Sequence, residues 1–255
     1  MPLQIDPIPA FETNYIWAIH NGRDCALVDP GSAAEALAFL GQNDLDLCAI
    51  LLTHHHADHI GGVDEILAHK NALIWGPDDQ RIPRVDRRVA EGDSVTVPEL
   101  DLKLTVLETP GHTSSHIVYF NDDLLLAGDT LFSAGCGRLF EGSAEQMQSS
   151  LDKLSKVPGD AEVYCAHEYT EDNCRFALAV EPDNSDLQAW AREVRRRRAA
   201  GQITLPTRLD HERGTNPFLR TREAAVVAAA KRHDSGCDGQ PAEVLATIRR
   251  WKDHF

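Results

Sequence analysis

The chain has 255 residues, 42% hydrophobic and 25% charged, which is enough to bury the core of a soluble globular protein of one large or two moderate domains. Its 40 acidic and 25 basic residues give a formal charge of -15, which disfavours nucleic acid as a partner because phosphates must be neutralised by Lys and Arg. The longest apolar stretch, residues 224–230, is far shorter than the roughly 20 residues of a membrane span, so no membrane partner is expected.

The N-terminal residues and the cysteines bear on the compartment. Residues 1–6 contain neither a basic region nor a long apolar run, so no signal peptide is expected. The six cysteines form no CxxC pair and are interpreted as free thiols in a reducing cytoplasm. We therefore expect a cytoplasmic protein. We also expect the protein to be a monomer.

The first two-thirds of the chain alternate short strand-like runs with turns and occasional helices. Asn21-Gly22 predicts a hairpin turn between strands at residues 14–20 and 25–28. An N-cap serine predicts a helix over residues 32–40 that ends at Gly41. The unbroken apolar run 47–52 is typical of a strand buried on both faces. The remaining predictions are strands at 102–107, 117–120, 124–127 and 162–165, and helices at 63–69 and 144–154.

The last third is rich in Ala, Arg, Glu and Leu, and its periodicity predicts helices separated by Pro and Gly. We therefore expect two domains, a mixed α/β domain over residues 1–168 and a helical domain over 169–255. The predicted helices of the second domain cover residues 171–180, 185–200, 222–232 and 241–251.

The segment Thr53-His54-His55-His56-Ala57-Asp58-His59 directly follows the buried strand 47–52. Imidazoles and carboxylates at this density suit a divalent metal such as zinc, iron or manganese. Alternation along an extended segment places His54 and His56 on one side and His55 on the other, so His55 is expected to be structural or to support a ligand. Asp58 and His59, beyond the strand, can reach a second metal position.

Three more candidate ligands follow strand-like runs: His112, Asp129 and His167. Any one of them alone is more simply explained as a hydrogen-bonding residue, but together with the histidine cluster they predict a metal centre. Two further residues have open roles. Asp29 either orients a ligand histidine or caps a turn, and His116 is expected to be structural.

This pattern resembles the metallo-β-lactamase superfamily: HxHxDH at residues 54–59, then His112, Asp129 and His167 in order. The resemblance implies an αββα sandwich and two divalent metal ions, zinc first and iron or manganese as alternatives. His54, His56 and His112 would bind one metal and Asp58, His59 and His167 the other, with Asp129 bridging. A histidine at position 56, where the oxygen-reducing di-iron members carry an acidic residue, disfavours dioxygen chemistry.

A narrower resemblance, to the glyoxalase II (hydroxyacylglutathione hydrolase) family, covers essentially the whole chain. It rests on four segments, residues 135–142, 167–170, 216–218 and 249–255. The resemblance implies that Arg138, Tyr169, Arg249 and Lys252 bind glutathione. It also implies hydrolysis of S-2-hydroxyacylglutathiones such as S-D-lactoylglutathione, the second step of methylglyoxal detoxification. Phe140 departs from members with tyrosine there and removes one hydroxyl from the expected glutathione contacts.

The residues suit this chemistry. Two metals about 3.5–4 Å apart lower the pKa of a shared water, so Asp58 and Asp129 with a metal-bridging hydroxide would be the catalytic set. Arg249 and Lys252, three residues apart on a predicted helix, share a face on which two cations can meet a carboxylate. The leaving thiolate has a conjugate-acid pKa of about 8.5 and needs no dedicated general acid.

Other functions stay open at this point. Within enzymes they are another superfamily member, such as a glutathione persulfide dioxygenase or a lactonase. Outside enzymes the alternative is a non-catalytic metal-binding module. Assays of S-D-lactoylglutathione against persulfide and lactone substrates discriminate among them.

Overall fold

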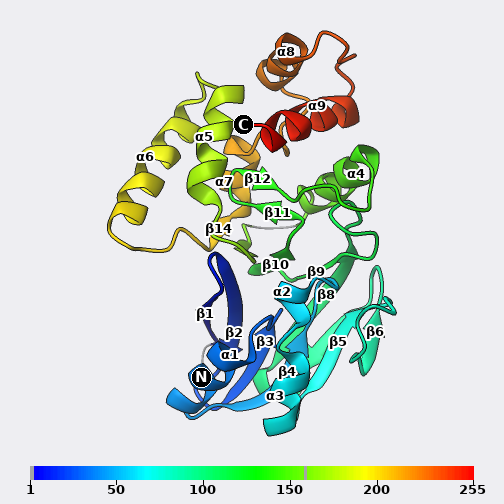
Figure 1. Cartoon of the computed structure of the whole chain (residues 1–255), viewed down its shortest axis with the longest axis vertical. Coiled ribbons are helices and arrows are strands. Elements are labelled where there is room, and N and C mark those ends of the chain that lie inside the picture. Colours follow the sequence, from blue (N-terminus) through cyan, green and yellow to red (C-terminus); the bar gives the residue numbers. More distant parts are fainter. Residues whose placement is uncertain (1–2, 158–159) are drawn as a thin grey trace. The chain divides into compact units, whose positions relative to one another are not determined.

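The computed structural model describes residues 3–157 and 160–255, and the chain divides into two compact units. Unit 1 comprises residues 1–108, 115–121 and 125–128, and unit 2 comprises residues 109–114, 122–124 and 129–255. Each unit is described here by itself, and Figure 1 identifies the elements by label and by colour along the sequence.

The first sheet of unit 1 has the strand order β1-β2-β3-β4-β5-β6. The first three strands are antiparallel, and β3 through β6 run parallel to one another. Parallel neighbours require a crossover connection, and two of the crossovers contain α1 and α3 (Figure 1). The strands are β1 (Gln4–Ala10), β2 (Asn14–His20), β3 (Asp24–Val28), β4 (Asp46–Leu51), β5 (Leu73–Pro77) and β6 (Arg87–Val89). The helices are α1 (Ala33–Gln42), α2 (Ala57–Ile60) and α3 (Val63–His69).

The second group of strands in unit 1 is an antiparallel meander, β7-β8-β9-β10. These strands are β7 (Ser94–Val97), β8 (Leu102–Glu108), β9 (Ile117–Phe120) and β10 (Leu124–Gly128), with the 3-10 turn η1 (Pro98–Leu100) between the first two. Buried Tyr119 donates its hydroxyl to the Leu52 carbonyl at 2.7 Å, and Ile117 N donates to Thr53 O at 3.0 Å. These bonds fix the start of β9 against the end of β4, where the histidine-rich segment begins.

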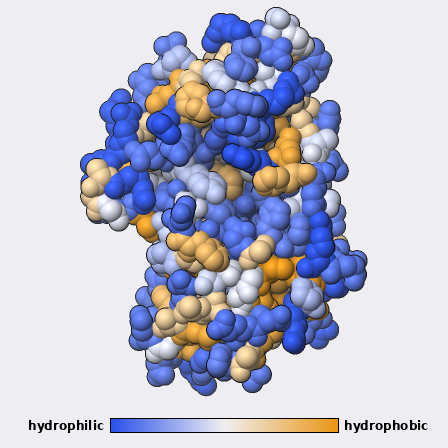
Figure 2. Space-filling view, viewed as in Figure 1, coloured by the Kyte–Doolittle hydropathy of each residue, from blue (hydrophilic) through white to orange (hydrophobic). Residues whose placement is uncertain are grey.

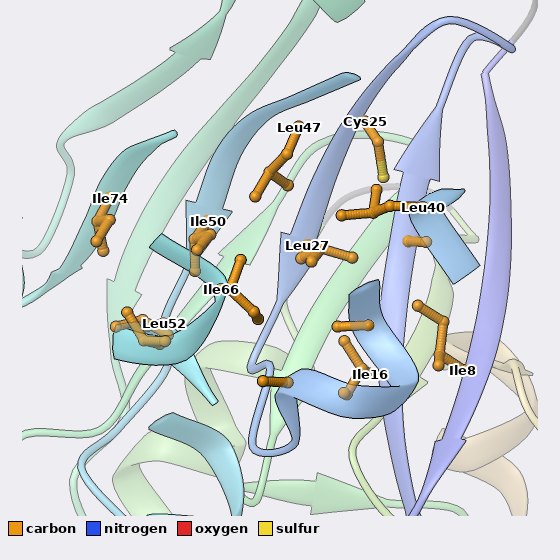
Figure 3. Close-up of a cluster of buried hydrophobic side chains, with 14 of the residues drawn as sticks. Ile8, Ile16, Cys25, Leu27, Leu40, Leu47, Ile50, Leu52, Ile66 and Ile74 are labelled. Carbon is orange, nitrogen blue, oxygen red and sulfur yellow. The ribbon is translucent and has the colours of Figure 1, made fainter. Parts of the chain in front are cut away.

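The core of unit 1 lies between its first sheet and the helices α1 and α3. Figure 3 shows Leu27 and Ile50 from the sheet facing Leu40 of α1 and Ile66 of α3. All four side chains are fully buried. Packing against these helices therefore makes the sheet rigid at β4, the strand that directly precedes the loop carrying His54.

Unit 2 combines small strand pairs with helices. Hydrogen bonds pair β11 (Leu131–Phe132) with β12 (Gly135–Cys136), and β13 (Glu162–Cys165) with β14 (Thr207–Arg208). Its apolar core joins Ala134 to the facing sides of α5 and α6, including Cys174 and Leu187. The helices are α4 (Ala144–Leu154), α5 (Thr170–Val180), α6 (Ser185–Ala199), α7 (Leu209–Thr215), α8 (Ala224–His233) and α9 (Pro241–Asp253).

Most predicted elements are confirmed, several to the residue, as for β2, β9, β13, α3 and α4. The predicted end of the first helix was wrong, because α1 continues through Gly41 to Gln42. Among the described residues, no helix is long and apolar enough to cross a membrane. Figure 2 shows a face that is mostly hydrophilic, with smaller hydrophobic patches between.

Candidate metal centre and substrate-binding residues

The histidine-rich loop of unit 1 has the alternation that its sequence predicts. Nε2 of His54 lies 3.0 Å from Nδ1 of His56, so these two imidazoles meet on one side. His55 faces the other way, with Nδ1 3.5 Å from a carboxylate oxygen of Asp79. The ring of His55 still meets that of His56 edge-on, with centroids 4.9 Å apart, but its Nδ1 is directed at the Asp79 carboxylate.

Asp29 orients His59. The backbone of Asp29 is left-handed, with φ 49°, and its carboxylate accepts from Thr53 N at 2.8 Å and from Thr53 Oγ1 at 2.7 Å. The same carboxylate lies 3.0 Å from Nδ1 of His59. A partner on Nδ1 directs Nε2 outward as a metal-binding atom. Of the two roles open for Asp29, the structure supports orientation of a histidine.

Asp58 is held by two residues that sequence reasoning did not select. The side-chain amide of Asn14, at the start of β2, donates to Oδ2 of Asp58 at 2.9 Å. A Cβ on Gly31 would lie 1.8 Å from the Asp58 carbonyl, so only glycine permits this close approach. Oδ2 of Asp58 also lies 3.5 Å from Nε2 of His59, which brings two of the predicted ligands together.

Asp129 lies between the two candidate histidines of unit 2. Its Oδ2 is 3.3 Å from Nε2 of His112, and its Oδ1 is 3.4 Å from Nε2 of His167. All three side chains are buried. Each carboxylate oxygen thus faces a different imidazole, which is the arrangement that a bridging ligand needs.

The loop after Asp129 surrounds His112. Nδ1 of His112 lies 2.9 Å from the carbonyl oxygen of Arg138, and Phe140 N donates to the His112 carbonyl at 3.2 Å. A Cβ on Gly137 would lie 2.1 Å from the Asp129 carbonyl. The loop 137–140 therefore fixes the ring of His112 with Nε2 directed at Asp129.

His167 is held by aromatic rings. Tyr169 stacks on it with ring centroids 4.7 Å apart and an interplanar angle of 4°, and Phe132 meets it edge-on at 5.9 Å. Tyr169 is 39% exposed. A predicted substrate residue thus lies directly on a predicted metal ligand.

Two of the three predicted glutathione-binding cations, Arg249 and Lys252, contact polar groups of the hairpin β11–β12 and of α5. Arg249 is buried and donates to the Cys136 carbonyl at 2.8 Å. Lys252 contacts the side-chain oxygen of Asn173, a residue that sequence reasoning missed. Arg138 and Arg249 both approach Asp253, at 3.5 and 3.2 Å.

Burial, followed by repulsion from Arg249, lowers the pKa of Lys252 from 10.5 to about 7. An ammonium with this pKa loses its charge near neutrality. A bound carboxylate would stabilise the charged form and raise the pKa again.

The hairpin β11–β12, between Asp129 and the 137–140 loop, is held by α7. Glu212 accepts from Ser133 Oγ at 2.9 Å and from Ala134 N at 2.8 Å. Asn216 donates to the carbonyls of Phe132 and Gly135 at 3.0 and 2.9 Å. Asn216 lies in a segment that carried the family resemblance, but nothing in the local pattern indicated Glu212.

The donor set fits divalent metals. In unit 1, Nε2 of His54 lies 3.0 Å from Nδ1 of His56, and Oδ2 of Asp58 lies 3.5 Å from Nε2 of His59. In unit 2, the Asp129 carboxylate joins two imidazoles whose Nε2 atoms point at it. Imidazole and carboxylate donors suit zinc, iron and manganese.

Comparison with known proteins agrees with this geometry. Residues 10–167 match the family model described as the metallo-beta-lactamase superfamily, and residues 168–255 match the model described as the hydroxyacylglutathione hydrolase C-terminus.

Two curated relatives are named hydroxyacylglutathione hydrolase. The one from Cupriavidus taiwanensis is 51% identical over 99% of each chain. The one from Aliivibrio salmonicida is 52% identical over 99% of this chain and 100% of the relative.

Among solved structures, ETHE1 from Myxococcus xanthus superposes with a TM-score of 0.64 at 23% identity, over 99% of this chain and 98% of that one. At this identity the likeness concerns the fold alone. The expected metallo-β-lactamase αββα fold is confirmed.

Proposed function

Because the chain belongs to the hydroxyacylglutathione hydrolase family of the metallo-β-lactamase superfamily, we propose that it hydrolyses the thioester of S-2-hydroxyacylglutathiones. The products are glutathione and a 2-hydroxy acid, and S-D-lactoylglutathione is the expected substrate in methylglyoxal detoxification. The observation that carries this proposal is Asp129, whose two oxygens face His112 and His167 separately.

The two half-sets of ligands are proposed to bind two divalent ions together. His54, His56 and His112 would bind one ion and Asp58, His59 and His167 the other, with Asp129 shared. When bound, the ions supply an activated water and a Lewis acid for the thioester carbonyl. Asp29 supports this assignment because it leaves Nε2 of His59 directed outward.

Arg138, Tyr169, Arg249 and Lys252 are proposed to bind the glutathione moiety. The glycine carboxylate of glutathione needs fixed cations, and charge-assisted bonds to Arg and Lys provide them. Repulsion between Arg249 and Lys252, which helps to lower the pKa of Lys252, supports a shared anion site. Phe140 is 62% exposed and offers no hydroxyl, so it can contribute only apolar contact.

The chain does not need a general acid for the leaving group. The sulfur departs as a thiolate whose conjugate acid has a pKa of about 8.5. The residues near Asp129 then have to orient the carbonyl carbon and to neutralise charge on its oxygen, rather than to deliver a proton.

The division into a catalytic part, residues 1–168, and a helical substrate-binding part, residues 169–255, is also a proposal. It is supported by the family models, which meet between residues 167 and 168. We propose a cytoplasmic location as well, supported by six free cysteines, five of them buried.

One experiment tests the proposed function. Purified protein is stripped with a chelator and reconstituted separately with Zn²⁺, Fe²⁺ and Mn²⁺, and metal content and hydrolysis are measured on the same sample. We expect about two ions per chain and turnover of S-D-lactoylglutathione above that of persulfide and lactone substrates. A fully metallated protein that leaves the thioester intact contradicts the proposal.

A further inference from the structure

The turn between β1 and β2 carries an exposed aromatic residue in a strained conformation. Phe11 has φ 51°, in the left-handed region, and its side chain is 61% exposed. For a residue with a Cβ this backbone conformation costs on the order of 1 kcal/mol. Hairpin turns favour Gly, Asn or Asp at such positions. The exposed side chain gains little burial to offset this cost.

The turn is tied to the metal-ligand loop. Ala10 of β1 pairs with Asn14 of β2, so residues 11–13 form the connection directly beyond this pair. Asn14 is buried and donates to Oδ2 of Asp58 at 2.9 Å. Phe11 therefore lies one short turn away from a residue that contacts a proposed metal ligand.

A hydroxyacylglutathione has two parts on either side of its thioester carbonyl. All four residues proposed to bind the glutathione part belong to unit 2. Asp58 and the turn at Phe11 belong to unit 1. The acyl substituent is bonded directly to the carbonyl carbon, so with that carbonyl at the proposed metal ligands this substituent is a part of the substrate that lies near Asp58.

We infer that Phe11 contacts the acyl substituent of the thioester and determines the preference among acyl groups. This inference rests on the proposed function and deepens it. A phenyl ring gives apolar contact to aliphatic and aromatic substituents, and the contact with an aromatic substituent is the most favourable. Backbone strain held at an exposed position is typical of residues that contact a ligand.

The test compares two thioesters that differ only in the acyl substituent, S-D-lactoylglutathione with a methyl group and S-D-mandeloylglutathione with a phenyl group. Phe11→Gly removes the side chain and permits the positive φ without strain. Phe11→Leu keeps an apolar side chain and the strain. Leu73→Ala is the matched control, because Leu73 is an exposed apolar residue of unit 1 that begins β5, away from the histidine loop.

For Phe11→Gly we expect the ratio of kcat/KM for mandeloyl to that for lactoyl to fall on the order of tenfold, with the melting temperature unchanged or higher. Phe11→Leu should give an intermediate ratio, and Leu73→Ala the wild-type ratio. Melting temperatures identify a variant that fails to fold. If Phe11→Gly does not fold, the ratio measured for Phe11→Leu alone tests the inference.

A wild-type ratio in folded, active Phe11→Gly, or in Phe11→Leu where only that variant folds, overturns the inference. An equal fall in Leu73→Ala overturns it too. If the wild-type protein hydrolyses neither thioester, the proposed function fails first and the inference fails with it. An active enzyme with unchanged discrimination removes only the role of Phe11.

Discussion

The two units hold their metal-ligand candidates in different ways. Unit 1 supplies His54, His56, Asp58 and His59 from one short segment that follows a buried strand. Unit 2 supplies His112, Asp129 and His167 from three separate loops. The first set shares one backbone segment, although Asp29 and Asn14 orient His59 and Asp58 from positions far away in sequence. The second set depends on a frame that joins its loops, the hairpin β11–β12 held by α7. The difference teaches that similar ligand chemistry can come from one segment or from several segments that the tertiary fold brings together.

The most direct test of whether both sets of candidates serve one metal centre is to remove one candidate ligand from each unit. Both His54→Ala and Asp129→Ala should lower kcat/KM for S-D-lactoylglutathione on the order of a thousandfold or more, because each removes a proposed metal ligand. Metal content and turnover are measured together. Asp183→Ala, which removes an exposed carboxylate of unit 2, is the control. Near-normal turnover by either ligand variant with full metal content contradicts the shared site.

The frame of unit 2 can be tested through Glu212. Its carboxylate accepts from Ser133, Ala134 and Thr207, and Glu212→Ala leaves these buried donors without an acceptor. We expect the free energy of unfolding in urea to fall by about 3 kcal/mol. Asp29→Ala in unit 1 should instead weaken metal binding by about 10- to 100-fold. A Glu212→Ala variant of wild-type stability would show that unit 2 does not depend on this frame.

The pH dependence of substrate binding sharpens the difference between the units, because Lys252 belongs to unit 2. Its pKa of about 7 means that it is charged at pH 6 and mostly neutral at pH 8.5. Loss of this cation weakens binding of the glycine carboxylate, so KM should rise with pH, by about tenfold. Lys252→Met should show a high KM that varies little with pH. Lys231→Met, which removes an exposed lysine, should keep the wild-type profile.

The smallest expected effect concerns Tyr169, whose ring stacks on His167. If its hydroxyl bonds the peptide backbone of glutathione, Tyr169→Phe should raise KM about three- to fivefold with little change in kcat. The phenylalanine ring preserves the stacking on His167. Steady-state kinetics with S-D-lactoylglutathione decide, and an unchanged KM removes this assignment.

The sequence predicts unit 1 well where apolar runs and local motifs are strong. The run that forms β4 and the alternating histidines behind it are confirmed. The strand β1 was missed, because Pro7 and Pro9 interrupt its pattern. An edge strand tolerates these prolines, whose nitrogens cannot donate to a neighbour.

In unit 2, the residues that the sequence analysis missed are those whose contacts are distant in sequence. The helix α7 is short and contains Gly214, so no helical periodicity indicates it. Yet α7 carries Glu212, which bonds residues far away in sequence at Ser133 and Ala134. Asn14 in unit 1 was missed for the same reason, since its partner Asp58 is 44 residues away. Such contacts are set by the tertiary fold and leave no local pattern.

The way in which His112 is anchored has an evolutionary consequence. Residue 138 fixes the imidazole through its backbone carbonyl. Its side chain is 65% exposed and takes no part in this contact. Because Arg138 is proposed to bind glutathione, a mutation at this position would alter which thiol is recognised and leave the proposed hydrolytic centre intact. New substrates can be acquired here in single steps, without passing through an inactive ancestor.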